Sequence, residues 1–247
     1  MYILCLYWVS LPYINFKITE NCLGNTSVFN KSYKTASMRY IVFVLVASSA
    51  IVCAYGLLAS PYNPPYYWEK AKRARYAIHY NSWGVIGTIS TQPKILGFPF
   101  TNIISYSDGP DSNSTGTPYF YVMNGDPSVQ DLAKNNSMSF SVSEMEPGYC
   151  MIHKYDAEDP RCARITIIGH FEKVTSPSEN KFAIATLFKK HPEMQTWPAG
   201  HDFFTAKIRI NFVWILDHFG GSSFIKAADY YAADPSKAVT NPNLMVN

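Results

Sequence analysis

Short runs of alternating apolar and polar residues recur along residues 83–216 and predict a mainly β fold. The runs are rich in β-branched and aromatic residues, and turn-forming residues separate them. They predict strands at residues 83–90, 101–107, 118–123, 139–144, 164–174 and 204–216. In the last run, one side of the predicted strand carries Ala206, Ile208, Ile210 and Phe212. The opposite side carries Lys207, Arg209 and Asn211.

Three segments have the periodicity of helices instead. The first has an apolar face made of Tyr67, Ala71, Ala74 and Ile78. Its cations lie mainly off that face, and we expect them to form a solvated surface: Lys70, Lys72, Arg73 and Arg75. The second helix is predicted at residues 128–134, with Ser128 as its N-cap. The third is predicted at residues 179–190 and ends before Pro192.

The order of these elements favours one architecture over another. Six short strands with inserted helices show no regular β-α-β alternation and no internal repeat, so a doubly wound sheet is disfavoured. A small β-barrel, closed or partly split, fits the pattern better. The sequence therefore predicts one barrel domain at residues 67–231, followed by a flexible tail at residues 232–247.

The region before the barrel has the pattern of a secretory leader. No charged side chain occurs between Tyr40 and Trp68, and the apolar run follows Met38 and Arg39 directly. We expect a signal peptide at residues 38–56, cleaved near Gly56, followed by a Pro-rich spacer at residues 57–66. The alternative is a retained membrane anchor. Residues 1–37 are then an upstream extension that precedes the natural start at Met38.

Composition and charge narrow the function classes. Of the 247 residues, 47% are hydrophobic and 16% are charged, which excludes a disordered, collagenous or coiled-coil chain. The formal net charge is +3, and the excess lies in residues 1–56, so the charges of the barrel region balance. A neutral domain offers no electrostatic surface for a phosphate backbone, and direct nucleic-acid binding is therefore not expected.

Cysteines and sequons agree with secretion. Cys150 and Cys162 are the two cysteines that remain after the leader, and we expect a disulfide between them. Two unpaired buried thiols are the alternative. Asn113 and Asn135 each begin an Asn-X-Ser/Thr sequon in the barrel region, and both are candidate N-glycosylation sites.

A search for catalytic and metal-binding patterns gives no match. The sequence contains no GxSxG, HExxH, Walker or GxGxxG motif, so no catalytic residue is assigned. One His-rich stretch has a spacing unlike that of metal sites, and we expect no metal there: His191, Glu193, His201 and Asp202. An acidic turn lacks the spacing of a calcium loop, and we expect it to be solvated: Asp156, Glu158 and Asp159.

Several long blocks resemble one protein family. They include WGVIGTIST, GFPFTNIISYSDG, LFKKHPEMQTWPAGHDFFTAKI and NFVWILDHFGG, and the resemblance covers about residues 68–231. The chain resembles the CREG family of "cellular repressor" proteins. These are secreted glycoproteins of the pyridoxamine-phosphate-oxidase-like superfamily of FMN-binding split barrels. The resemblance implies a six-stranded split β-barrel, a homodimer, and a non-enzymatic role in growth and differentiation.

The resemblance also bears on the partners of the protein and on whether it binds FMN. Family members reach endosomes and lysosomes, and a receptor of the mannose-6-phosphate/insulin-like-growth-factor-two type is a candidate partner. The related oxidases hold FMN at the dimer interface. Candidate groups for its phosphate here are Thr88, Ser90, Ser105, Ser107, Arg164, Lys207 and Arg209. None matches a cofactor motif, so no cofactor is expected, with an FMN-dependent oxidoreductase as the alternative. A haem-binding relative, with His170 or His201 as ligand, is a third reading.

Overall fold

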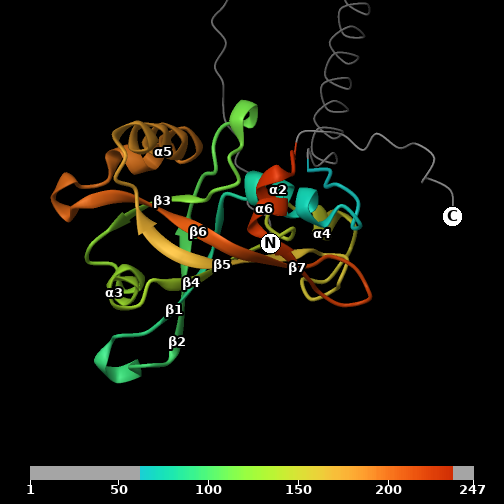
Figure 1. The fold of residues 1–247 in the computed structure, drawn as a ribbon, viewed down its shortest axis with the longest axis horizontal. Coiled ribbons are helices and arrows are strands. Elements are labelled where there is room, and N and C mark those ends of the chain that lie inside the picture. Colours follow the sequence, from blue (N-terminus) through green and yellow to red (C-terminus); the bar gives the residue numbers. More distant parts are fainter. Residues whose placement is uncertain (1–61, 236–247) are drawn as a thin grey trace, which may run out of the picture. The chain divides into compact units, whose positions relative to one another are not determined.

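A computed structural model describes residues 62–235 of the chain (Figure 1). The predicted signal peptide, the predicted upstream extension and most of the predicted tail lie outside these described residues. Six strands follow the sequence prediction closely: β1 (Trp83–Ile89), β2 (Pro99–Ser105), β3 (Tyr119–Met123), β4 (Ser137–Ser143), β5 (Arg164–Lys173) and β6 (Phe203–Leu216). A seventh, β7 (Ser223–Lys226), pairs with β6 and was not predicted.

Within residues 62–235, five α-helices accompany the strands: α2 (Lys70–Tyr80), α3 (Pro127–Lys134), α4 (Tyr149–Ile152), α5 (Pro177–Lys190) and α6 (Ala227–Ala232). The predictions for α2, α3 and α5 are confirmed, whereas α4 and α6 were missed. The first helix begins at Lys70, so Tyr67 precedes it and is 39% exposed, while Ala74 and Ile78 are fully buried as expected. No helix among the described residues is long and apolar enough to cross a membrane.

The strands form one antiparallel sheet curled into a half-barrel, as the resemblance implied. Their order is β2-β1-β4-β5-β6-β3, and β7 pairs with the C-terminal part of β6, so β2 forms one edge while β3 and β7 form the other. The edges approach each other at one end, where Ser107 and Tyr119 form an isolated antiparallel bridge. The remaining length of the two edges is a seam along which the barrel is split.

The barrel interior is closed by α2 and α6, which lie beside each other over the sheet (Figure 1). The main core joins Ile78 of α2 and Tyr230 of α6 to Phe120, Phe140 and Ile165 of the strands, all fully buried. A second cluster packs α5 against β3 through Leu187, Ala183 and Tyr119. Burial of this apolar surface is the main term that stabilises the domain.

The expectation of a solvated cationic surface on α2 is wrong for two of its four cations. Arg73 is 6% exposed and Arg75 is 4% exposed. Arg73 donates to both carboxylate oxygens of Glu144, from Nε at 2.9 Å and from Nη2 at 2.6 Å. Glu144 comes from the end of β4 and is itself fully buried, so the pair links the helix to the sheet. Lys70 pairs with Asp217, and Lys72 with Glu69.

The predicted side of β6 is correct for its first half only. Ile208 and Ile210 are buried, but Phe212 is 48% exposed and Val213 takes the inward position. The register between β5 and β6 shifts at Gly169, where Ile168 pairs with Phe212 and Gly169 with Ile210. This bulge adds Asn211 to β6 and reverses the side that each later residue faces.

The N-terminus of α3 differs from the prediction. Asp126, rather than Ser128, is the N-cap of α3, because its carboxylate accepts from the backbone N–H groups of Ser128 and Val129.

The expected Cys150–Cys162 disulfide is present, with a Cα–Cα distance of 5.4 Å. It closes the loop that carries the acidic residues of the proposed solvated turn: Asp156, Glu158 and Asp159. Within this loop Asp159 pairs with Arg161.

Candidate functional site

A cleft with the character of a ligand-binding site lies along the seam between β2 and β3. This seam cleft has a volume of about 350 Å³. Its floor is apolar, with Ile86 of β1, Ile104 of β2 and Val122 of β3. A mostly apolar cleft with a few polar groups is the usual form of a small-molecule site.

One wall of the seam cleft is built from stacked aromatic rings. The Tyr121 ring lies 4.9 Å from Phe203 at 16° and 6.0 Å from Trp197 at 23°. Trp197 is placed by the segment after α5, which forms the 3₁₀ helix η3 (Pro192–Thr196) and is followed by Pro198. The family-like LFKKHPEMQTWP block therefore covers one side of the seam.

The polar end of the seam cleft carries a negative charge. It consists of Asn102, Asp126 and Ser128. A helix N-terminus is a natural anion site, but here Asp126 Oδ1 accepts from Ser128 N at 2.8 Å and Val129 N at 3.3 Å. The chain's own carboxylate thus caps the N-terminus of α3. The residues that line the cleft include no lysine or arginine, so they do not fit a flavin phosphate.

The seven candidate phosphate groups do not converge. Lys207 Nζ pairs with Glu179 at 2.7 Å, and Arg209 Nε pairs with Glu172 at 2.6 Å. The Thr88 hydroxyl donates to Asp131. The Ser90 and Ser107 hydroxyls accept from the nearby backbone N–H groups of Gln92 and Gly109. Arg164 lines a different groove, together with Trp83 and Trp214, and Ser105 alone of the seven lines the seam cleft.

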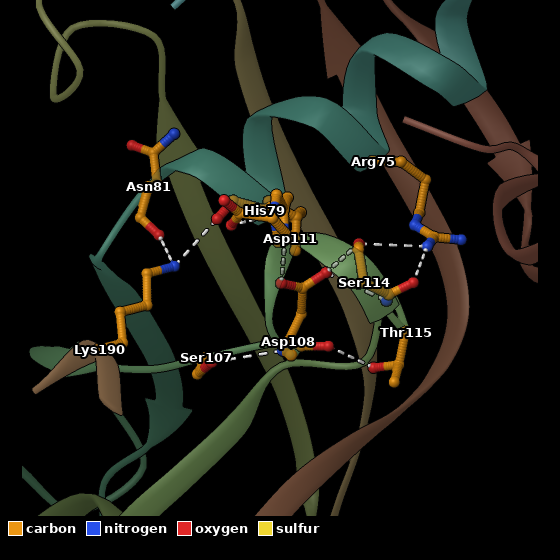
Figure 2. A network of polar contacts seen from close by, with 12 residues as sticks. Arg75, His79, Asn81, Ser107, Asp108, Asp111, Ser114, Thr115 and Lys190 are labelled. Carbon is orange, nitrogen blue, oxygen red and sulfur yellow. Dashed lines mark hydrogen bonds and ion pairs between the residues drawn. The ribbon is translucent and has the colours of Figure 1, made fainter. Parts of the chain in front are cut away.

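Sequence reasoning missed a buried polar network at the C-terminus of α2 (Figure 2). His79 Nδ1 lies 2.7 Å from Asp108 Oδ1, and Nε2 lies 3.3 Å from Asp111 Oδ1. Burial alone would raise the pKa of the Asp108 carboxyl, but the hydrogen bond and charge of His79, with the Ser114 hydroxyl, lower it overall. Burial lowers the pKa of Lys190, whose Nζ donates to the carbonyls of His79 and Asn81.

This network is not arranged as a nucleophilic triad. The serine hydroxyl nearest the pair, that of Ser114, donates to Asp108 Oδ2 at 2.6 Å rather than to His79. The histidine faces a carboxylate on each side and activates no hydroxyl. The network instead holds the loop at residues 108–116 against α2. The sequence signal was only the SDG turn, which does not show that a histidine 29 residues earlier would meet it.

The histidines considered for metal or haem have other surroundings. His191 caps the C-terminus of α5, and its Nε2 lies 3.0 Å from the carbonyl oxygen of Tyr106. His201 is exposed in the 3₁₀ helix η4 (Ala199–His201). His170 lies between Asn136 and Asn211, each within hydrogen-bond distance of one ring nitrogen. In the part of the chain that the structure describes, no three His, Cys, Asp or Glu residues gather as metal ligands would.

Both candidate glycosylation sites in the barrel are exposed. Asn113 ends the 3₁₀ helix η2 (Asp111–Asn113) within the loop that His79 and Asp108 hold. Asn135 is the C-cap of α3, and its Oδ1 accepts from Ser137 N at 3.1 Å. Each side-chain amide nitrogen can therefore carry a sugar without disturbing the barrel core.

Comparison with known proteins agrees with this fold and with the family resemblance of the sequence. The CREG β-barrel family model matches residues 65–232. Human Protein CREG2 is 42% identical over 175 residues, covering 71% of this chain, which spans only 60% of that protein's length. Chicken Protein CREG1 is 40% identical over 191 residues, covering 75% of this chain and 98% of the relative.

Among solved structures, a heme binding protein from Mycobacterium smegmatis has a similar fold. The TM-score is 0.54 at 20% sequence identity, over 66% of this chain and 60% of that one. At this identity the likeness concerns the fold alone. The match of the family model over most of the barrel, together with relatives at about 40% identity, identifies the family. The chain belongs to the CREG family.

Proposed function

We propose that this protein is a secreted, N-glycosylated, non-enzymatic member of its family that acts as a homodimer. It would work through protein contacts in growth and differentiation control, outside the cell and in endosomes and lysosomes. A receptor of the mannose-6-phosphate/insulin-like-growth-factor-two type is a candidate partner for its glycans. The structural feature that carries the proposal is the face of the sheet opposite α2 and α6, which we call the open face.

The open face presents a row of side chains across six strands. In register they are Ile103 of β2, Val85 of β1, Ser141 of β4, Thr166 of β5, Trp214 of β6 and Phe224 of β7. Large apolar residues on this face are well exposed, with Ile103 at 67%, Phe224 at 68% and Phe212 at 48%. Large apolar side chains exposed on both sides of Ser141 and Thr166 make this face a candidate interaction surface.

The shape of the open face suits a second copy of the same chain. A groove of about 520 Å³ lies between Trp83 and Trp214, with Val85 and Thr166 on its floor. In a two-fold dimer the same patch contacts itself, so it needs both a hollow and projecting groups. The open face offers both, because Phe212 and Phe224 project beside the groove. Aromatic residues at the centre of a patch are also the usual anchors of protein interfaces.

The oligomeric state tests this surface directly. Light scattering at micromolar concentration is expected to give twice the monomer mass for the secreted chain. Phe212→Asp should give a monomer, because a carboxylate would be buried without a partner at the interface. Leu96→Asp is the matched control, since Leu96 is 67% exposed but lies in the turn between β1 and β2. A monomeric wild-type protein would contradict the dimer, and equal dissociation by both variants would contradict the open face as its interface.

A flavin titration tests the non-enzymatic reading. FMN fluorescence is expected to stay unchanged as folded protein is added, because Asp126 occupies the anion position and Lys207 and Arg209 are paired. Saturable quenching at micromolar protein would instead support the FMN-dependent oxidoreductase. In that case Lys207 and Arg209 would be the first residues to replace.

A further inference from the structure

A polar groove, distinct from the seam cleft and the open face, lies beside the first sequon. It has a volume of about 350 Å³. One wall is the loop at residues 111–115, which includes Asn113, and the other is the segment at residues 231–235. We call it the sequon groove. The two walls are separated by more than a hundred residues in sequence, so the tertiary fold creates the groove.

The guanidinium of Arg75, in α2, forms hydrogen bonds to both walls of the sequon groove. Its Nη2 donates to the Ser114 carbonyl at 2.7 Å (Figure 2), and its Nη1 donates to the carbonyls of Tyr231 at 3.2 Å and Ala233 at 3.0 Å. The guanidinium has planar, fixed donor directions, so these bonds set the spacing of the walls. Gly116 allows the close approach, since a Cβ there would lie 2.5 Å from Arg75 Nε.

Asp108 also holds in place the wall of the groove that carries Asn113. Its Oδ2 accepts from the Ser114 hydroxyl at 2.6 Å and from the Gly116 backbone N–H at 3.2 Å. Its carbonyl accepts from the Thr115 backbone N–H at 2.8 Å. The loop that carries Asn113 is thus held by buried polar contacts. A preformed groove binds its ligand at a smaller entropic cost than a mobile one.

The opposite wall presents an anchored aromatic ring. Tyr231 is 41% exposed and lines the groove. Its hydroxyl lies 3.2 Å from the Thr117 hydroxyl, and its ring packs edge-on against Tyr230, with centroids 5.5 Å apart. Two contacts therefore fix the direction of the ring. An aromatic face packs well on the C–H face of a pyranose, while the Asp, Ser and Thr groups of the facing wall can bind its hydroxyls.

We infer that the sequon groove holds the N-acetylglucosamine core of the glycan attached to Asn113. The inference rests on the proposed N-glycosylation. Asn113 is part of the groove lining, so a sugar on its side chain begins inside the groove. Such a tethered ligand has a high effective concentration and needs little intrinsic affinity. The first sugars then lie against Tyr231 and are shielded from enzymes in solution.

Asn135 supplies an internal control within the same molecule. It lies at the end of α3 and is not among the residues that line the sequon groove. In native protein secreted from eukaryotic cells, we expect peptide-N-glycosidase to release the Asn113 glycan several-fold more slowly than the Asn135 glycan. Glycopeptide mass spectrometry gives both the initial occupancy and the release rate at each site.

Variants of Tyr231 separate shielding by the ring from other causes. Tyr231→Ala should raise the release rate at Asn113 to that at Asn135 and leave Asn135 unchanged. Tyr231→Phe keeps the ring and should retain most of the shielding. Equal release at both sites in the wild type, or no response to Tyr231→Ala, would overturn the groove assignment alone. An unoccupied Asn113 in secreted protein would overturn it together with the proposed glycosylation at that site.

Discussion

Replacing Glu144 with alanine is expected to destabilise the domain by about 3–5 kcal/mol, the usual cost of leaving a buried charge without its partner. The carboxylate is fully buried and accepts from Arg73 twice, from the Ala163 backbone N–H at 3.2 Å and from the Tyr62 hydroxyl at 3.3 Å. Loss of the carboxylate would leave the Arg73 guanidinium without its buried counter-charge and the Ala163 backbone N–H without this acceptor. The change should appear as a lower urea midpoint for unfolding of the purified protein.

A matched double variant distinguishes pairing from packing. Arg73→Met with Glu144→Leu removes both charges at similar volume, and such replacements are often close to neutral. We expect the double variant to be more stable than Glu144→Ala. A Glu144→Ala midpoint equal to that of the wild type would show that the pair contributes nothing to holding α2 on the sheet.

Loss of the disulfide should have the second largest effect. Cys150→Ser with Cys162→Ser is expected to lower the free energy of unfolding by about 2–4 kcal/mol, because the unfolded chain regains the entropy of an open loop. Cys162 lies beside Ala163, whose backbone N–H donates to Glu144. Reducing agent applied to the wild type should give a similar midpoint. Unchanged stability after reduction would contradict a structural role for the bond.

The sequence predicted the elements well where the apolar pattern was long and regular. Six strands and three helices were placed close to their observed positions. The short β7 was missed because four residues show too little alternation, and it is held by pairing with β6. Phe212 was placed on the wrong side because a bulge reverses the alternation, and no local residue pattern announces it.

The candidate sites depended more strongly on distant contacts. Arg73 and Arg75 looked like solvated cations because their acceptors, Glu144 and the backbone near Tyr231, lie far away in sequence. Asp126 was missed as a helix cap, although it is the acidic residue that makes the seam cleft unsuited to a phosphate. The sequons and the cysteine pair were visible directly, because each rests on local residue identity.

The position of β3 at the sheet edge has a consequence for folding during synthesis. β3 pairs with β6, whose first residue lies 80 positions after the end of β3, whereas β1 and β2 form a local hairpin. Contacts over such separations form late, since a long loop must close first. While β6 is still being translated, β3 is an unpaired strand exposed to other chains. The Asn113 loop just before it is open in the same interval, so a sugar added then would cover the nascent edge and favour solubility until β6 arrives.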